Sequence, residues 1–215
     1  YNEASRIADV LACALGHPLI GEVIVVDDAS SDGTSAVVAA IGGAKLITLT
    51  QNGGKTAALA EGIAAAQGEV LLLVDADLVG LSAQDLTALL EPVLQGRADV
   101  SISLRRNAPR LWQWIGLDYI SGERALRRSL IAPELARLRH LPKFGFEVFL
   151  NGLMVQNQAR IAVVEWPGVI SPLKGAKYGW AKGIRADFGM IRDMVRVHSL
   201  PRLLRQILRM RQLRV

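Results

Sequence analysis

The first hundred residues alternate between short aliphatic runs and helix-like segments. The aliphatic runs, typical of buried strands, lie at residues 22–28, 45–50, 69–77 and 98–104. Segments that predict helices lie before and between them, at residues 3–15, 31–41, 54–68 and 82–94. Strands and helices that alternate at this length are typical of an α/β protein. The pattern predicts a mostly parallel sheet covered by helices on both faces.

The pattern changes after residue 104. Residues 105–145 are basic and aromatic and show no clear strand, whereas 146–159 predicts a helix and 161–168 a further strand. Near the end of the chain, apolar residues spaced three and four apart predict an amphipathic helix with arginines beside its apolar stripe. The stripe is Leu200, Leu203, Leu204, Ile207 and Leu208, and the arginines are Arg202, Arg205 and Arg209. We therefore expect one α/β domain over residues 1–190 and a basic amphipathic helix over 191–215.

The composition disfavours several classes of protein. With 215 residues, of which 51% are hydrophobic and 21% charged, the chain can bury a core and is not expected to be disordered. The single cysteine, Cys13, cannot form an internal disulfide, and the histidines show no spacing typical of a zinc site. No apolar run approaches the roughly 18 residues that a membrane-spanning helix needs. We expect a cytoplasmic protein.

Positive charge is concentrated at the end of the chain. The net charge is +5, and six arginines but no acidic residue follow Asp193. This asymmetry indicates an anionic partner. A helix of this kind can lie on an anionic membrane, or it can pack on the domain or on a second subunit. A nucleic-acid partner is disfavoured, because the tail has no aromatic residue to stack on bases.

Two of the predicted strands end in aspartates. Asp27 and Asp28 close one strand, and Asp75 and Asp77 close another. Ligands of open parallel sheets bind at the carboxyl ends of the strands, so all four carboxylates are expected at one rim. Clustered carboxylates repel one another unless a cation lies between them, and Mg²⁺ or Mn²⁺ with a diphosphate would supply that cation. The alternative is that these aspartates only cap helices and form turns.

The segment QNGGKT at residues 51–56 resembles the end of a nucleotide-binding P-loop. The first glycine of that motif would fall at position 49, where the chain has Leu49, so ATP or GTP hydrolysis is not expected. The glycines can still let the backbone approach a ligand. Lys55 either contacts a phosphate there or is a solvated lysine at the start of a helix.

Several of these motifs together resemble family 2 glycosyltransferases with the GT-A fold. The matching segments are YNE (1–3), VVDDASSDGT (25–34), residues 52–78, SGERALRR (121–128) and IAVVEWPG (161–168). The resemblance implies an α/β Rossmann-like sheet with one more strand before Tyr1, and an inverting transfer from a nucleotide-sugar donor. Within the family, the basic middle region is similar to the dolichyl-phosphate mannose synthase and polyprenyl-phosphate glycosyltransferase branch. Gln51 departs from the family, where a basic residue is common, and a Q-x-x-R-W motif typical of processive synthases is not seen.

The resemblance also implies the roles of individual residues. Asp75 and Asp77 match the family's D-x-D motif and would hold Mg²⁺ or Mn²⁺ on the donor diphosphate, with Asp77 counted among the catalytic residues. Tyr1 would lie against the base, and Asp28 would hydrogen-bond the nucleoside. The remaining residues expected to bind the donor are Asn2, Glu3, Asp27, Asn52, Gly54, Lys55 and Ala76.

The acceptor is expected to carry a phosphate. Arg105, Arg124 and Arg128 are the arginines that we expect to grip it, with Arg124 also assigned a catalytic role. A solvated helix face is the alternative for Arg128. A phosphate acceptor needs no general base, whereas a hydroxyl acceptor would need one, and Glu147 is then the candidate, unless it only pairs with a nearby arginine.

The sequence is therefore interpreted as a metal-dependent hexosyltransferase that moves a sugar, by default from a UDP-sugar, to a lipid-linked phosphate or another acceptor. It is expected to be peripheral at the inner face of the membrane. Two alternatives remain open at this point. One is a nucleotidyltransferase acting on a sugar phosphate, and the other is a non-catalytic, membrane-recruited module that binds nucleotide-sugars.

Overall fold

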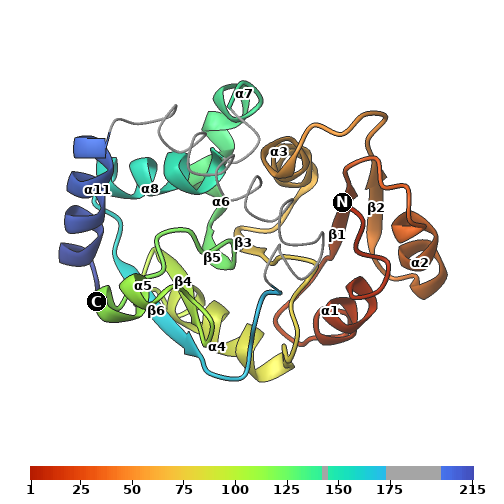
Figure 1. Cartoon of the computed structure of the whole chain (residues 1–215), viewed down its shortest axis with the longest axis horizontal. Coiled ribbons are helices and arrows are strands. Elements are labelled where there is room, and N and C mark those ends of the chain that lie inside the picture. Colours follow the sequence, from red (N-terminus) through yellow and green to blue (C-terminus); the bar gives the residue numbers. More distant parts are fainter. Residues whose placement is uncertain (142–144, 173–199) are drawn as a thin grey trace.

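The computed structural model describes residues 1–141, 145–172 and 200–215 (Figure 1). Helices and strands alternate over most of the chain, as the sequence pattern predicts. In chain order the elements are α1 (Ile7–Ala14), β1 (Ile24–Asp27), α2 (Thr34–Ile41), β2 (Lys45–Thr48), α3 (Lys55–Ala65), β3 (Val70–Leu73), α4 (Ala83–Leu94), β4 (Val100–Arg105), α5 (Arg110–Ile115), β5 (Arg124–Arg127), α6 (Arg128–Ile131), the 3₁₀ helix η1 (Ala132–Glu134), α7 (Leu135–Leu138), α8 (Phe146–Gln156), β6 (Ile161–Trp166) and α11 (Leu200–Gln212).

The strands form two hydrogen-bonded sheets. Strands β1 and β2 pair in parallel, and the larger sheet has the order β3-β5-β4-β6. Strands β4 and β6 are parallel, whereas β5 runs antiparallel to both of its neighbours. The expected α/β class is confirmed, and the parallel pairs are those formed by the strands that the sequence predicts.

The prediction that residues 105–145 contain no strand is wrong. The segment Arg-Ala-Leu-Arg at 124–127 is β5, and its partners are β3 and β4. The segment has no β-branched or aromatic residue, so intrinsic strand preference gives no signal for it. Pairing with a strand on each side, together with burial of its first three residues, holds it extended.

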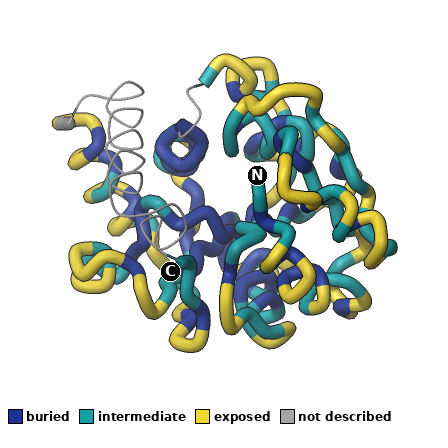
Figure 2. Tube along the Cα trace, turned by 45° about the vertical axis from the view of Figure 1, so that its right-hand side comes forward, coloured by how far each residue is buried: buried dark blue, intermediate teal, exposed yellow. Residues whose placement is uncertain are grey.

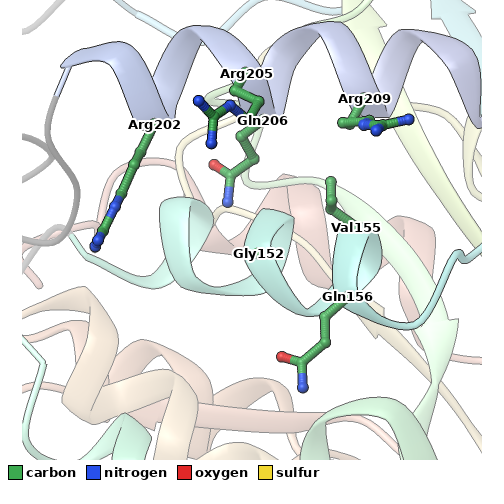
Figure 3. Close-up of a pocket in the computed structure, with 7 residues that line it drawn as sticks. All are labelled: Gly152, Val155, Gln156, Arg202, Arg205, Gln206 and Arg209. Carbon is green, nitrogen blue, oxygen red and sulfur yellow. The ribbon is translucent and has the colours of Figure 1, made fainter.

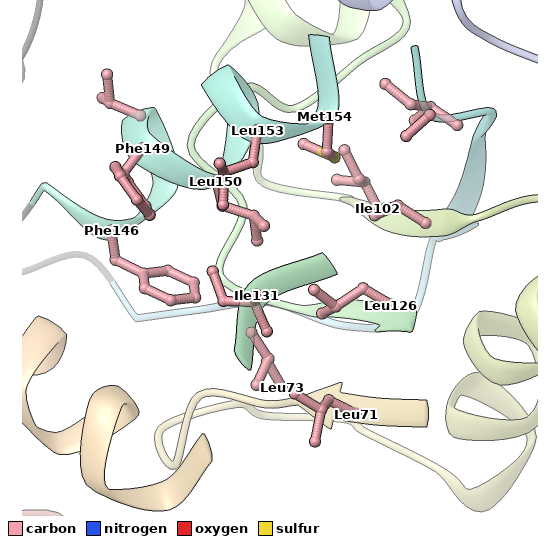
Figure 4. Close-up of a cluster of buried hydrophobic side chains, with 14 of the residues drawn as sticks. Leu71, Leu73, Ile102, Leu126, Ile131, Phe146, Phe149, Leu150, Leu153 and Met154 are labelled. Carbon is pink, nitrogen blue, oxygen red and sulfur yellow. The ribbon is translucent and has the colours of Figure 1, made fainter. Parts of the chain in front are cut away.

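Helices cover both faces of the larger sheet. On one face, the buried side chains of α8, among them Phe146, Leu150 and Met154, pack over β3, β4 and β5 (Figure 4). On the other face, Leu86 and Leu89 of α4 pack in a second cluster. Figure 2 shows the buried residues concentrated in the interior and the exposed ones on the outer loops.

The C-terminal helix α11 lies along α8 (Figure 1). Leu203 and Met210 join the main core cluster, and Gln206 is buried between them. Leu204 and Leu208 remain 63% and 61% exposed. The helix itself is confirmed, but its predicted apolar stripe is divided, with one part packed on the domain and the other facing outward. The expected boundary at residue 191 lies outside the described residues.

Within the described part of the chain, none of the helices combines the length and the apolar character that a membrane crossing requires.

Candidate functional site

Asp28 follows β1, and its carboxylate is held by the glycine turn that precedes α3. It accepts hydrogen bonds from the backbone N–H of Gly53 at 2.7 Å and of Gly54 at 2.8 Å. The Nδ2 of Asn52 donates to the Asp28 carbonyl at 3.3 Å. A Cβ at Gly53 would lie 2.7 Å from the Ala57 Cβ, and Gly54 has φ of 86°, so both positions favour glycine. The segment that resembles a P-loop therefore cradles a carboxylate of the protein.

The neighbouring Asp27 is turned toward the loop that follows β1. It accepts hydrogen bonds from the hydroxyls of Ser30 and Ser35 and from the Ser30 N–H at 3.1 Å. Burial alone would raise the pKa of Asp27, but these donors outweigh it and lower the pKa below the ordinary 3.8. Asp27 therefore stabilises the loop as a carboxylate.

The first residues of the chain lie against this same loop. The Asn2 N–H donates to Ser30 Oγ at 2.8 Å, and Asn2 Oδ1 accepts from the Ser31 N–H at 2.9 Å. The Glu3 N–H donates to Thr34 Oγ1 at 2.9 Å. Tyr1 is half exposed at the edge of the loop. The structure thus brings together residues 1–3 and 27–34, two of the segments expected to form the donor site.

Lys55 joins three elements of the site. Its ammonium Nζ lies 2.8 Å from Asp75 Oδ1 and 2.9 Å from Glu147 Oε1. Lys55 begins α3, Asp75 follows β3, and Glu147 lies in the first turn of α8. Burial acts to lower the pKa of Lys55, but the two carboxylates outweigh it and raise the pKa. The Lys55 and Asp75 side chains are 28% and 29% exposed, so a ligand can reach them.

Gly122 allows this group to assemble. A Cβ at this position would lie 2.4 Å from Lys55 Nζ and 2.8 Å and 2.9 Å from the two carboxylate oxygens of Asp75. Any side chain at residue 122 would therefore occupy space that the ammonium and the carboxylate now fill. The sequence motif SGER includes Gly122, but nothing in the sequence alone indicates which side chains approach it.

A buried polar layer lies behind Asp75. Glu123 accepts hydrogen bonds from the hydroxyls of Ser103 and Ser121, each at 2.9 Å, and lies 3.4 Å from Arg105. Arg105 also pairs with the buried Asp118 at 3.5 Å. Burial and then the nearby charge of Asp75 raise the pKa of Glu123, against the lowering effect of Arg105. Arg105 therefore compensates internal carboxylates, and sequence reasoning missed both of its partners.

Arg124 is fully buried in the sheet. Its guanidinium donates to the Ser121 carbonyl at 2.9 Å, to Asn151 Oδ1 at 2.6 Å and to the Tyr119 carbonyl at 3.2 Å. These contacts fasten the loop before β5 to α8. They argue against the expected role of Arg124 in gripping an acceptor or in catalysis.

Arg128 and Asp75 lie at opposite ends of strand β3. In the antiparallel register, Arg127 pairs with Val70 at the start of β3, whereas Arg124 pairs with Leu73 at its end. The Arg128 N–H donates to the Glu69 carbonyl at 2.8 Å, before β3 begins. This placement argues against a contact between Arg128 and an acceptor bound near Asp75.

Asp75 and Asp77 provide carboxylate oxygens that suit a hard divalent cation. Both are partly exposed, with Ala76 between them. Asp77 Oδ1 accepts a long hydrogen bond from Ser171 Oγ at 3.4 Å, and paired backbone hydrogen bonds between Val79 and Ile170 join the two loops. Among the described residues, no set of three or more acidic, histidine or cysteine ligands is assembled. Two carboxylates completed by phosphate oxygens of a substrate are a donor set that Mg²⁺ commonly uses, so the residues fit such an ion.

The arrangement of helices and strands is also found in solved structures of known proteins. Glucosyl-3-phosphoglycerate synthase from Mycobacterium tuberculosis, in complex with Mn²⁺, UDP-glucose and phosphoglyceric acid, superposes with a TM-score of 0.67. The likeness covers 90% of this chain and 76% of that one at 22% identity, and it shows the fold. A glycosyl transferase family 2 model matches residues 1–148. The chain therefore belongs to glycosyl transferase family 2, as its motifs predict.

Two curated relatives match part of the chain. The undecaprenyl-phosphate 4-deoxy-4-formamido-L-arabinose transferase of Aeromonas hydrophila is 36% identical over 96 residues, which are 42% of this chain and 29% of that protein. The succinoglycan biosynthesis protein ExoO of Rhizobium meliloti is 41% identical over 80 residues, which are 36% of this chain and 23% of that protein. The chain thus spans less than a third of the length of either relative.

Proposed function

We propose that this protein transfers a hexose from a UDP-sugar to a lipid-linked phosphate, with inversion at the anomeric carbon. The observation that supports it best is the run of contacts from Asp28 through the glycine turn to Lys55, and from Lys55 to Asp75 and Glu147. This run joins the ends of β1 and β3 at one edge of the fold. Ligands of open α/β sheets bind outside the carboxyl ends of the strands, which is where Asp28 follows β1 and Asp75 follows β3.

The donor would lie along this run of contacts. Asp28 is fixed by two backbone amides and is placed to accept from a nucleoside, with Tyr1 and Asn2 at the same loop. Asp75 and Asp77 would hold Mg²⁺ or Mn²⁺ on the diphosphate. When bound, such an ion neutralises the charge that develops on the leaving nucleoside diphosphate. Lys55, positively charged next to Asp75, is placed to attract the same phosphates.

The proposed reaction needs little proton transfer. An acceptor phosphate oxygen attacks the anomeric carbon, the bond from that carbon to the diphosphate breaks, and its electron pair leaves with UDP. A phosphate is already ionised, so no base is required. Glu147 has an oxygen 2.9 Å from Lys55 Nζ, and this contact favours a role in positioning the lysine. The lipid-phosphate acceptor is proposed by analogy with the Aeromonas relative, whose name includes undecaprenyl phosphate. An acceptor of this kind implies that the protein works at the membrane surface.

Product analysis tests the reaction. The protein would be incubated with UDP-sugars, Mn²⁺ and either a short polyprenyl phosphate or the matching alcohol. We expect UDP and a glycosylated lipid phosphate from the first acceptor only. The proposed acceptor and the absence of a general base would be overturned if the wild type transfers the sugar to the alcohol and Glu147→Gln does not. Release of pyrophosphate would identify a nucleotidyltransferase instead.

A further inference from the structure

A groove of about 270 Å³ lies between α8 and α11, away from the site described above (Figure 3). One wall comes from Gly152, Val155 and Gln156 of α8, and the other from Arg202, Arg205, Gln206 and Arg209 of α11. Arg202 and Gln206 extend from α11 toward α8 (Figure 3). The groove is smaller than the roughly 300–1,000 Å³ typical of pockets for drug-sized ligands, and it suits a small polar group.

The position of α11 fixes which of its residues line the groove. Gln206 is buried, accepts a hydrogen bond from the Tyr119 hydroxyl and donates one to the Val148 carbonyl at 3.3 Å. Leu203 and Met210 pack in the core on the same side of the helix. These contacts prevent α11 from rotating on the domain. Its arginines are therefore held along the groove by the fold.

Among the residues that the structure describes, the lining of the groove carries positive charge and no acidic side chain. Arg202, Arg205 and Arg209 succeed one another at intervals of three and four residues, a spacing at which like charges on a helix repel. Within the described ranges, the side-chain hydrogen bond that these arginines make is from Arg209 to the neutral Gln212, at 3.2 Å. Three forked guanidinium donors beside an open groove favour a phosphate group as the ligand.

Exposed apolar side chains lie next to this charge. Leu204 and Leu208 stand one turn apart on α11 and alternate with the groove arginines. Helix α5 is in contact with the segment that follows α11, where Arg214 Nη1 donates to the Ile115 carbonyl at 3.5 Å. On α5, Trp114 is 81% exposed. Tryptophan and leucine beside arginines are the composition of a helix that lies in the surface of an anionic bilayer.

We propose that the α8–α11 groove binds the phosphate headgroup of an anionic membrane lipid, with Leu204, Leu208 and Trp114 entering the lipid layer. The inference rests on the membrane location included in the proposed function, but not on the transfer chemistry. Binding here would hold the protein on the membrane independently of the donor and the acceptor. It assigns a ligand class to a groove that the glycosyl-transfer site does not use.

Vesicle sedimentation tests this assignment. The full chain would be mixed with phosphatidylcholine vesicles that contain or lack phosphatidylglycerol, at a fixed ionic strength. The groove variant Arg202→Gln/Arg205→Gln/Arg209→Gln would be compared with a control that removes three exposed arginines elsewhere, Arg97→Gln/Arg127→Gln/Arg137→Gln. We expect the groove variant to lose on the order of 100-fold in partitioning to anionic vesicles, given the usual contribution of each arginine near such a surface. The control variant should lose less than about fivefold.

Three results would overturn the proposal. Equal losses in the two triple variants would indicate unspecific attraction to charge. Unchanged partitioning of Leu204→Ser/Leu208→Ser would exclude insertion of α11. The third result has two parts: the wild type does not partition to either kind of vesicle, and inorganic phosphate raises the Tm of the wild type but not of the groove variant. The groove would then bind free phosphate. Circular dichroism would establish that each variant is folded, and UDP-dependent thermal stabilisation, expected to be intact in all of them, would test the donor site separately.

Discussion

Replacing Gly122 with alanine probes the assembly of the donor site most directly. The new Cβ would lie 2.4 Å from Lys55 Nζ, whereas ordinary van der Waals contacts begin at 3.4 Å. The ammonium must therefore retreat by about 1 Å, and the Asp75 carboxylate, whose oxygens would lie 2.8 Å and 2.9 Å from the new Cβ, must also move. A displacement of about 1 Å at a reacting site can cost about 100-fold in rate, and we expect Gly122→Ala to lose activity of that order.

The same substitution should affect stability little. The atoms that must move are the ends of two side chains that are partly exposed, and the backbone at Gly122 does not have a positive φ. We expect a cost of about 1 kcal/mol, which corresponds to about 2–4 °C in Tm for a chain of this size. The loss of function would then be separate from any loss of fold.

The assay combines turnover, UDP binding by calorimetry with Mn²⁺ present, and thermal unfolding. Gly21→Ala is the matched control, because nothing lies within 4 Å of the Cβ that it would add. The reasoning is refuted if Gly122→Ala keeps wild-type turnover and UDP affinity. It is also refuted if Tm falls by more than about 8 °C, since the backbone rather than the side-chain ends would then have moved.

Three further substitutions test other parts of the structure. Arg124→Lys keeps the charge but not the three forked contacts, so the unfolding free energy measured in urea should fall by about 3 kcal/mol, and a loss below about 1 kcal/mol would contradict a buried structural role. Burial alone would raise the pKa of Asp27, but its hydrogen bonds lower it, so its stabilisation is present above the ordinary 3.8 and is lost as the pH falls through and below that value. The stability of Asp27→Asn, from urea unfolding between about pH 5 and pH 3, should therefore fall less steeply than that of the wild type, and equal slopes would disprove this. Lys55→Met leaves Asp75 and Glu147 without the ammonium between them, so its Tm at neutral pH should be lower than the wild-type value, and an unchanged Tm would count against repulsion between the two carboxylates.

The sequence predicts most of the fold because aliphatic runs and helix-forming segments alternate clearly in its first hundred residues. Residues 24–27, 45–48 and 70–73 are strands as expected. Strand β5 escapes prediction because its extended form depends on β3 and β4, which are distant in sequence. The C-terminal helix is predictable from its period, but which of its leucines pack inward depends on the shape of α8 and the core.

The candidate site is predictable to the extent that strand ends position side chains. The loop after β1 and residues 1–3 meet as their motifs imply. The roles of the arginines are less predictable, because the local sequence does not indicate whether an arginine side chain is exposed to solvent or buried in the core. Arg124 lies in the core and Arg105 pairs with buried carboxylates, and neither contact leaves a signal in the local sequence.

The four aspartates that raised the question of repulsion are compensated in different ways. Asp27 accepts hydrogen bonds from hydroxyls, Asp28 from backbone amides, Asp75 from the Lys55 ammonium and Asp77 from the Ser171 hydroxyl. The charges of Asp27 and Asp28 are therefore compensated by donors of the protein itself, and Asp28, with one amide on each oxygen, keeps lone pairs that can accept from a nucleoside. Asp75 pairs with an ammonium that an anionic diphosphate would also attract. Because one ammonium cannot neutralise Asp75, Glu147 and a diphosphate together, a donor that draws Lys55 toward its phosphates would increase the affinity of Asp75 for a second cation. This competition gives a physical reason to expect that divalent metal and nucleotide bind together, each more weakly without the other.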